Sequence, residues 1–213
     1  AQLLEQGGAV AIGTFEAPPK QIPYQAFVQA LTSVVERPLT ESDGVLAVWQ
    51  ARLGEALGNL APAAAELIPS LTLVLGDLPE LPDIGPSEAR NRMHRAIGRL
   101  LDLLGEKGPL TLVLDDAQWS DAASVDLLRA LLRERGKTST SSKSALLVIL
   151  CVRSGLVDAS HPLTRLLHEL ELGDHPPARV ELEPLVQHDL EQLLADMLGR
   201  EPNEVRGLAE LVG

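Results

Sequence analysis

Residues 109–121 read PLTLVLDDAQWSD, an uninterrupted apolar segment that ends in two adjacent carboxylates. A parallel strand with helices on both faces needs a continuous apolar run, and residues 110–114 supply one. In open α/β sheets, ligands bind at the carboxyl ends of the strands. We therefore predict an α/β fold with a parallel sheet, in which Asp115 and Asp116 lie at the binding edge.

The paired acids allow two interpretations. In the first, Asp115 holds Mg²⁺ through water, and Asp116 orients or deprotonates a water molecule. In the second, they only cap a helix that begins near Ala122, because Asp is a common N-cap residue. Asp121 is a further candidate cap for that helix, with Ser124 at the fourth position.

The phrase LDDAQWSDAASVDLL, residues 114–128, resembles the Walker B segment of the AAA-like STAND ATPases of large bacterial signalling proteins. These include multi-sensor kinases, adenylate cyclases and LuxR-type regulators. Residues 13–16 and 22–27 resemble the segment that follows the second strand of that family, and residues 148–153 resemble its sensor strand. The resemblance implies a P-loop NTPase-like parallel sheet, with strand order 5-1-4-3-2, that binds ATP and Mg²⁺.

The resemblance also assigns roles to three residues. Asp115 becomes the Mg²⁺-side carboxylate, Asp116 the catalytic, water-orienting one, and Arg153 an arginine that senses the γ-phosphate. An arginine that leaves a strand end is also a common solvated residue, so both interpretations of Arg153 stay open. Gln118 and Trp119 belong to the same phrase, and a Trp just past a strand usually packs over the sheet edge.

The phosphate-binding loop of such an ATPase, G-x-x-x-x-G-K-[ST], does not occur in the sequence. Gly136-Lys137-Thr138 has Leu131 where the first glycine is required, and it leads into a Ser-rich loop. The sequence therefore resembles a domain cut off just after its phosphate-binding element, with residues 1–6 as the tail of the next helix. We expect weak or no ATP binding by this chain alone.

The remaining periodicity alternates strands with helices and contains a helical insert at about residues 22–106 with proline-rich joints. We expect the insert to pack as a layer against one edge of the sheet and to serve as a contact surface. Residues 1–185 are predicted to form the NTPase-like core, and 186–213 the beginning of a helical lid. The predicted strands are residues 9–13, 110–114, 146–152 and 179–182, and the helices outside the insert are 123–135, 162–170, 188–198 and 202–212.

Charge and hydrophobicity bear on which partners and which location the protein can have. The formal net charge of −12 disfavours direct nucleic-acid binding, which needs a basic face. The longest apolar run, residues 145–152, is too short to span a membrane, and residues 1–6 lack the features of a secretory signal. These features predict a cytoplasmic protein. Cys151 falls in an apolar strand pattern and is expected to be a buried, inert thiol.

Two other classes of protein compete with the ATPase interpretation. A haloacid-dehalogenase-like phosphatase needs D-x-D, but the second acid would fall at Ala117. The stronger alternative is a non-catalytic interaction or scaffolding domain that keeps the NTPase fold. The favoured interpretation is part of a signal-transduction ATPase that binds and hydrolyses ATP as a conformational switch, beside kinase, cyclase or DNA-binding output domains.

Overall fold

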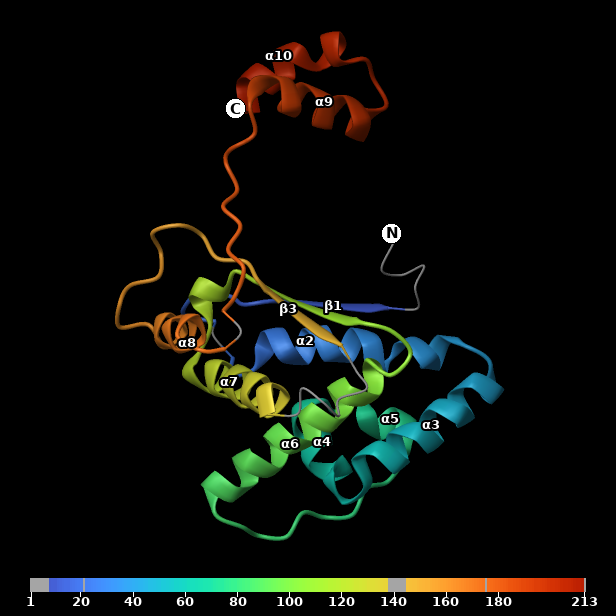
Figure 1. Cartoon of the computed structure of the whole chain (residues 1–213). Helices are drawn as coiled ribbons and strands as arrows, with labels where there is room; N and C mark the ends of the chain where they lie inside the picture. The colour runs from blue at the N-terminus through green and yellow to red at the C-terminus, as the bar shows by residue number, and fades with distance from the viewer. Residues whose placement is uncertain (1–7, 21, 138–144, 175, 213) are drawn as a thin grey trace. The chain divides into compact units, whose positions relative to one another are not determined.

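The computed structural model describes residues 8–20, 22–137, 145–174 and 176–212. The chain divides into two compact units, Ala1–Pro176 and Pro177–Gly213 (Figure 1). The compact units meet between residues 176 and 177. The functional domain boundary expected between residues 185 and 186 stays a prediction. In the part of the chain that the structure describes, no helix combines the length and the apolar character needed to cross a membrane.

The first unit is built on a parallel sheet of three strands, β1 (Ala9–Thr14), β2 (Leu110–Asp115) and β3 (Leu146–Leu150). Their order is β1-β2-β3, which is the predicted order of the second, third and fourth strands of the family sheet. Thr14 lies opposite Asp115, and Leu114 lies opposite Leu150. All three carboxyl ends therefore meet at one edge, and the predicted α/β fold is confirmed.

Helix α2 (Gln25–Val35) approaches β1 so closely that one position must be glycine. A Cβ atom built on Gly13 would lie 1.8 Å from the carbonyl oxygen of Ala26, far inside van der Waals contact. The absence of a side chain at Gly13 lets the strand and helix backbones touch. This contact fixes where the connection after β1 begins.

The helices after α2 form the predicted helical layer. Helix α6 contacts α3, α4 and α7, while α2 joins the insert to β1 and β2. The apolar periodicity of the insert also predicts which side chains this layer buries, and all of them are buried except Leu67, which is partly buried against the same core. These residues are Leu53, Leu57, Leu67, Ile68, Ile97, Leu100 and Leu104. The elements that follow α2 in the insert are η1 (Arg37–Thr40), α3 (Asp43–Leu57), η2 (Gly58–Leu60), α4 (Ala61–Leu67), α5 (Leu71–Leu75) and α6 (Pro86–Leu104).

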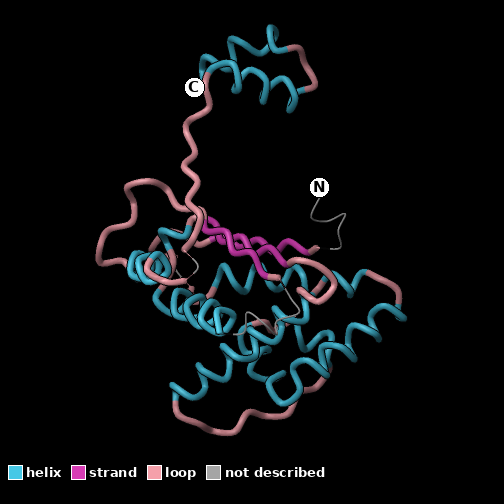
Figure 2. Tube along the Cα trace, in the orientation of Figure 1, coloured by secondary structure: helices cyan, strands magenta, loops and turns pink. Residues whose placement is uncertain are grey.

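The two faces of the sheet differ in their cover. Helices lie along one side of the three strands (Figure 2), where Ala11 and Leu112 are completely buried. On the opposite face, Ile12 is 55% exposed and Leu147 is 50% exposed. The continuous apolar run of β2 predicts cover on both faces, yet the described residues place helices over only one.

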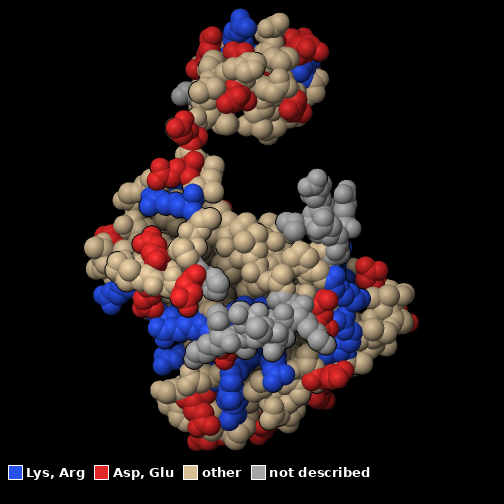
Figure 3. Space-filling view, viewed as in Figure 1, with Lys and Arg blue, Asp and Glu red and all other residues tan. Residues whose placement is uncertain are grey.

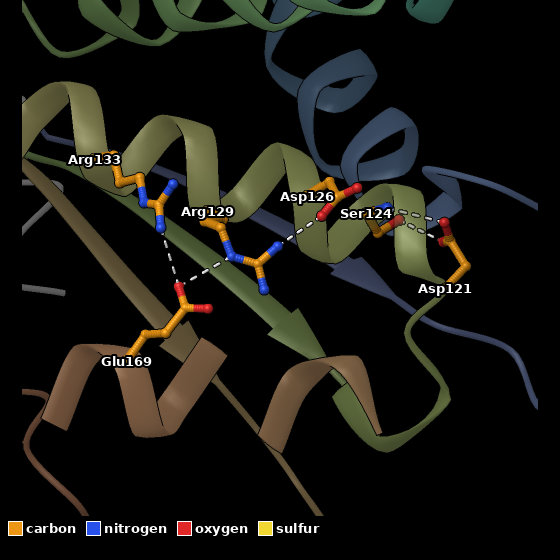
Figure 4. Close-up of polar contacts among 6 residues, drawn as sticks. All are labelled: Asp121, Ser124, Asp126, Arg129, Arg133 and Glu169. Carbon is orange, nitrogen blue, oxygen red and sulfur yellow. Dashed lines mark hydrogen bonds and ion pairs between the residues drawn. The ribbon is translucent and has the colours of Figure 1, made fainter. Parts of the chain in front are cut away.

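Three described helical segments follow β2 within the first unit. A short 3₁₀ helix, η3 (Ala117–Trp119), leads into α7 (Ala122–Lys137), and α8 (Pro162–Glu171) follows β3. Arg129 and Arg133 of α7 both pair with Glu169 of α8, at 3.2 and 3.4 Å (Figure 4). Helices α7 and α8 therefore pack side by side.

The second unit consists of α9 (Gln187–Leu198) and α10 (Pro202–Val212), which pack against each other. Gly199, in the left-handed region at φ 61°, ends α9. The strand predicted at residues 179–182 is wrong: this segment is irregular, with Val180 79% and Leu182 90% exposed. Alternating residues form a strand only where a neighbouring strand pairs with them, and no described strand does so here.

Candidate functional site at the carboxyl edge of the sheet

The predicted acids lie where β2 leaves the sheet. Asp115 is the last residue of β2, and its exposed side chain accepts the backbone N–H of Asp116 at 2.9 Å. Asp116 adopts the left-handed conformation, φ 51° and ψ 40°, which turns the chain sharply into η3. A positive φ is uncommon outside glycine, and Asp and Asn tolerate it best. The sharp turn separates the directions of the two carboxylates.

Arg153 meets Asp116 across the edge of the sheet. Its Nε atom lies 3.0 Å from Oδ1 of Asp116, and its Nη2 atom lies 3.4 Å from Oδ2. The arginine side chain is 69% exposed, whereas that of Asp116 is 24% exposed. The structure therefore brings together two of the three residues predicted for the site, from the ends of neighbouring strands.

Asp115 is less engaged than Asp116. Among the described residues it forms no ion pair, although it lies beside the thiol of Cys151. An exposed carboxylate that has no cationic partner can bind a hard cation such as Mg²⁺. No cluster of three potential ligands from His, Cys, Asp or Glu occurs in the described part of the chain.

Cys151 is exposed, so the prediction of a buried thiol is wrong. Strand β3 ends at Leu150, one residue earlier than this position, and Cys151 emerges at the carboxyl edge. Desolvation and the charge of Asp115 raise the pKa of the thiol. A raised pKa leaves less thiolate at neutral pH, so the expectation of low reactivity does not depend on burial.

Gln118 is a site residue that the sequence did not single out. It is 3% exposed, and its Nε2 donates to Oδ1 of Asp116 at 2.7 Å. This hydrogen bond, followed by those from Arg153, lowers the pKa of Asp116 below its ordinary value. The only sequence signal for Gln118 is its place in the phrase DDAQW, since glutamine itself has no preference for such a position.

The prediction that Asp121 caps α7 is confirmed. Its Oδ1 accepts the backbone N–H of Ser124 at 2.9 Å, and its Oδ2 accepts the Ser124 hydroxyl (Figure 4). The same pair receives the backbone N–H of Tyr24, at 3.3 Å from Asp121 and 3.1 Å from Ser124. Asp115 and Asp116 do not cap this helix, so the capping interpretation belongs to Asp121 alone.

Tyr24 is the residue on the other side of this network. It precedes α2 and has a left-handed φ of 64°, which a side chain disfavours. Burial and the nearby Asp121 carboxylate raise the pKa of its phenol above the ordinary 10.0. The segment between β1 and α2 is thus tied to the start of α7.

Comparison with known proteins agrees with this geometry. A family model described as "AAA ATPase domain" matches residues 1–149. A curated relative, hybrid signal transduction histidine kinase G of Dictyostelium discoideum, is 34% identical over 111 residues, which are 52% of this chain and 3% of the relative. The chain thus corresponds to a small part of that protein. No solved structure matches.

The family match covers the sheet strands β1 and β2, the whole helical insert and the acids at the end of β2. It also reaches into β3 and ends before Arg153, which lies three residues past that strand. The three-stranded parallel sheet with its helical layer is the arrangement that such a match leads one to expect. This chain belongs to the AAA ATPase domain family.

Proposed function

We propose that this chain is part of an ATP-dependent switch in a signalling protein, with ATP and Mg²⁺ as its ligands. The observation that carries the proposal is the ion pair between Arg153 and Asp116, 3.0 Å apart at the carboxyl edge of the sheet. Membership of the AAA ATPase domain family supports the nucleotide, and the similarity to a histidine kinase supports a signalling role.

Each acid has a distinct task in the proposed reaction. Asp115, whose oxygens are less engaged, would hold Mg²⁺ through water, while Asp116 would orient the attacking water and draw off its proton. Bound ATP and Mg²⁺ supply the phosphoryl group and the neutralising charge. The exposed guanidinium of Arg153 would sense the γ-phosphate.

The exposure of Arg153 makes a switch physically reasonable. An ion pair this open to water adds little to stability, because water and salt screen it. A phosphate is a stronger partner for a guanidinium than an exposed carboxylate is. Arg153 can therefore leave Asp116 for a phosphate at small cost, and its departure would free the carboxylate for water.

The proposed switch needs a phosphate-binding loop, and residues 1–213 contain no G-x-x-x-x-G-K-[ST], so we propose that another segment supplies it. Calorimetry tests this. We expect weak or no ATP–Mg²⁺ binding by residues 1–213 and clear binding by a longer chain that includes such a loop. Low-micromolar affinity of the shorter chain would contradict the proposal, since it would require a second phosphate site.

The absence of that loop from the sequence also favours one other function, a non-catalytic interaction or scaffolding domain. The two functions are separated by the longer chain. Binding with Mg²⁺-dependent hydrolysis supports the switch, while no binding supports the scaffold. In either case we propose a cytoplasmic location and neighbouring kinase, cyclase or DNA-binding output domains as partners.

A further inference from the structure

Gln118 uses both ends of its amide to join the two halves of the candidate site. Its Nε2 donates to the Asp116 carboxylate at 2.7 Å, and its Oε1 accepts the backbone N–H of Arg153 at 3.1 Å. The side chain is 3% exposed, so water competes little for either bond. A residue that served only to fill space would need neither hydrogen bond.

The backbone around Gln118 already links the same two segments. The N–H of Ala117 donates to the carbonyl of Cys151 at 2.9 Å, and the N–H of Cys151 donates to the carbonyl of Leu114 at 3.0 Å. The pairing of β2 with β3 thus continues one step past the sheet. Gln118 adds the next link through its side chain, because the backbone has by then turned into η3.

This arrangement fixes Asp116 independently of the Arg153 side chain. The guanidinium of Arg153 is exposed and exchangeable, whereas the backbone N–H of Arg153 is held by a buried amide. If the guanidinium turns away, one oxygen of Asp116 still accepts from Gln118. The carboxylate then keeps its direction while it loses its cationic partner.

We propose that Gln118 is a positioning residue for ATP hydrolysis, which keeps the Asp116 carboxylate in place when the Arg153 side chain leaves it. The inference rests on the proposed function, since it assigns Gln118 a part in that reaction. Gln118 touches neither nucleotide nor water in this role. It acts through Asp116 and the Arg153 backbone.

The test uses the ATPase-competent protein that contains this chain. Gln118→Met keeps most of the side-chain volume and removes both hydrogen bonds. We expect kcat to fall about 10- to 100-fold, the cost of a misplaced catalytic group, while the KM for ATP–Mg²⁺ changes less than about twofold. Gln118→Glu, which keeps an acceptor for Arg153 but places a charge against Asp116, should also lose kcat.

Gln192→Met is the matched control. Gln192 donates its amide to Asp196 at 3.0 Å on the exposed side of α9, so the same chemical change occurs away from the site. We expect wild-type kcat and KM for this variant. A second readout needs no activity: hydrogen exchange at the Arg153 backbone amide should be slow in the wild type and faster in Gln118→Met.

The outcomes separate this inference from the proposed function. Wild-type protein that binds no ATP or does not hydrolyse it overturns both. An active wild type with unchanged kcat in Gln118→Met overturns the positioning role alone. So does a loss of kcat in Gln118→Met that is fully additive with that of Asp116→Asn, because residues that act through one another are not additive.

Discussion

The connection from β2 to α7 carries one polar network at its start and another at its end, and the two differ in charge and exposure. At the start, Asp116 pairs with a guanidinium that is 69% exposed. At the end, Asp121 and Ser124 hold each other and the backbone N–H of Tyr24 in a part-buried site. The first network reaches toward β3 and the second toward β1.

This difference separates a bond that can exchange its partner from one that cannot. A guanidinium in water can move to another anion, whereas the N–H of Tyr24 can leave Asp121 only if the chain before α2 moves with it. The connection from β2 to α7 is therefore held in place at its α7 end, whereas at its β2 end the Arg153 side chain can exchange one anion for another. The four predictions that follow test this contrast.

The largest difference is expected when the same Asp→Asn change is made at Asp116 and at Asp121. Asp116→Asn should suppress ATP hydrolysis by about 10²- to 10⁴-fold with little change in binding, because the amide keeps the shape and loses the base. Asp121→Asn should leave the rate of hydrolysis within about twofold, since the amide keeps one acceptor for the helix cap and Asp121 bonds to Ser124 and Tyr24, not to Asp116 or Arg153. ATPase and binding measurements on the ATPase-competent protein check both. Equal losses in the two variants would contradict the contrast.

The next effect concerns the anchor on the β1 side. Gly13→Ala should destabilise the protein by about 3 kcal/mol, because the new methyl group would overlap the carbonyl oxygen of Ala26. Gly54→Ala is the control: this helical position has no atom within 4 Å of a built Cβ, so we expect a gain of about 0.5–1 kcal/mol. Urea denaturation measures both. A neutral Gly13→Ala would show that β1 and α2 can separate freely.

Asp121→Ala should lower the free energy of unfolding by about 1–2 kcal/mol, the usual cost of a lost N-cap. Asp126→Ala is the comparison, since Asp126 caps nothing and pairs at 2.6 Å with Arg129, three residues later in the same helix. We expect about 0.5 kcal/mol or less for Asp126→Ala. Thermal or chemical denaturation measures both free energies of unfolding. A larger loss in Asp126→Ala than in Asp121→Ala would contradict the capping role of Asp121.

The smallest effect is a titration. Tyr24 is the one tyrosine of the sequence, so absorbance near the phenolate band reports it alone. Burial and then Asp121 raise its pKa above 10.0, so Asp121→Asn should lower that pKa part of the way back. Because the folded pKa lies above the unfolded one, this group's contribution to stability is complete below pH 10.0 and declines as pH rises through the folded pKa. An unchanged Tyr24 pKa in Asp121→Asn would show that the charge of Asp121 does not act on the phenol.

The sequence predicted the elements that depend on local patterns. The strands at residues 9–13 and 110–114 and the helix at 202–212 follow from apolar periodicity and appear within a residue of the expected bounds. Asp116 was predicted at the binding edge because it follows a buried strand, and the family resemblance assigned Arg153 to the same site. The structure pairs the two side chains. Their catalytic and sensing roles remain predictions.

What the sequence missed depends on contacts between distant segments. The amide oxygen of Gln118 accepts the backbone N–H of Arg153, which lies 35 positions later in the sequence. No local sequence pattern predicts a hydrogen bond between residues so far apart. Residues 179–182 alternate as a strand does, but without a paired neighbour their apolar side chains stay exposed. Cys151 follows the apolar run of β3 in sequence but lies past the last ladder residue.

The uncovered face of the sheet governs how this chain behaves in solution. Val10, Thr111 and Leu147 form one row across the strands, and Ile12, Val113 and Ile149 form the next, so this face is apolar except for Thr111. Figure 3 shows an uncharged area where the sheet lies, on a molecule whose net charge is −12. Like charge keeps such molecules apart at low ionic strength, and salt screens that repulsion while sulfate strengthens apolar contact. Solubility should therefore fall steeply as sulfate is added, because burial of this apolar face between copies of the chain becomes more favourable.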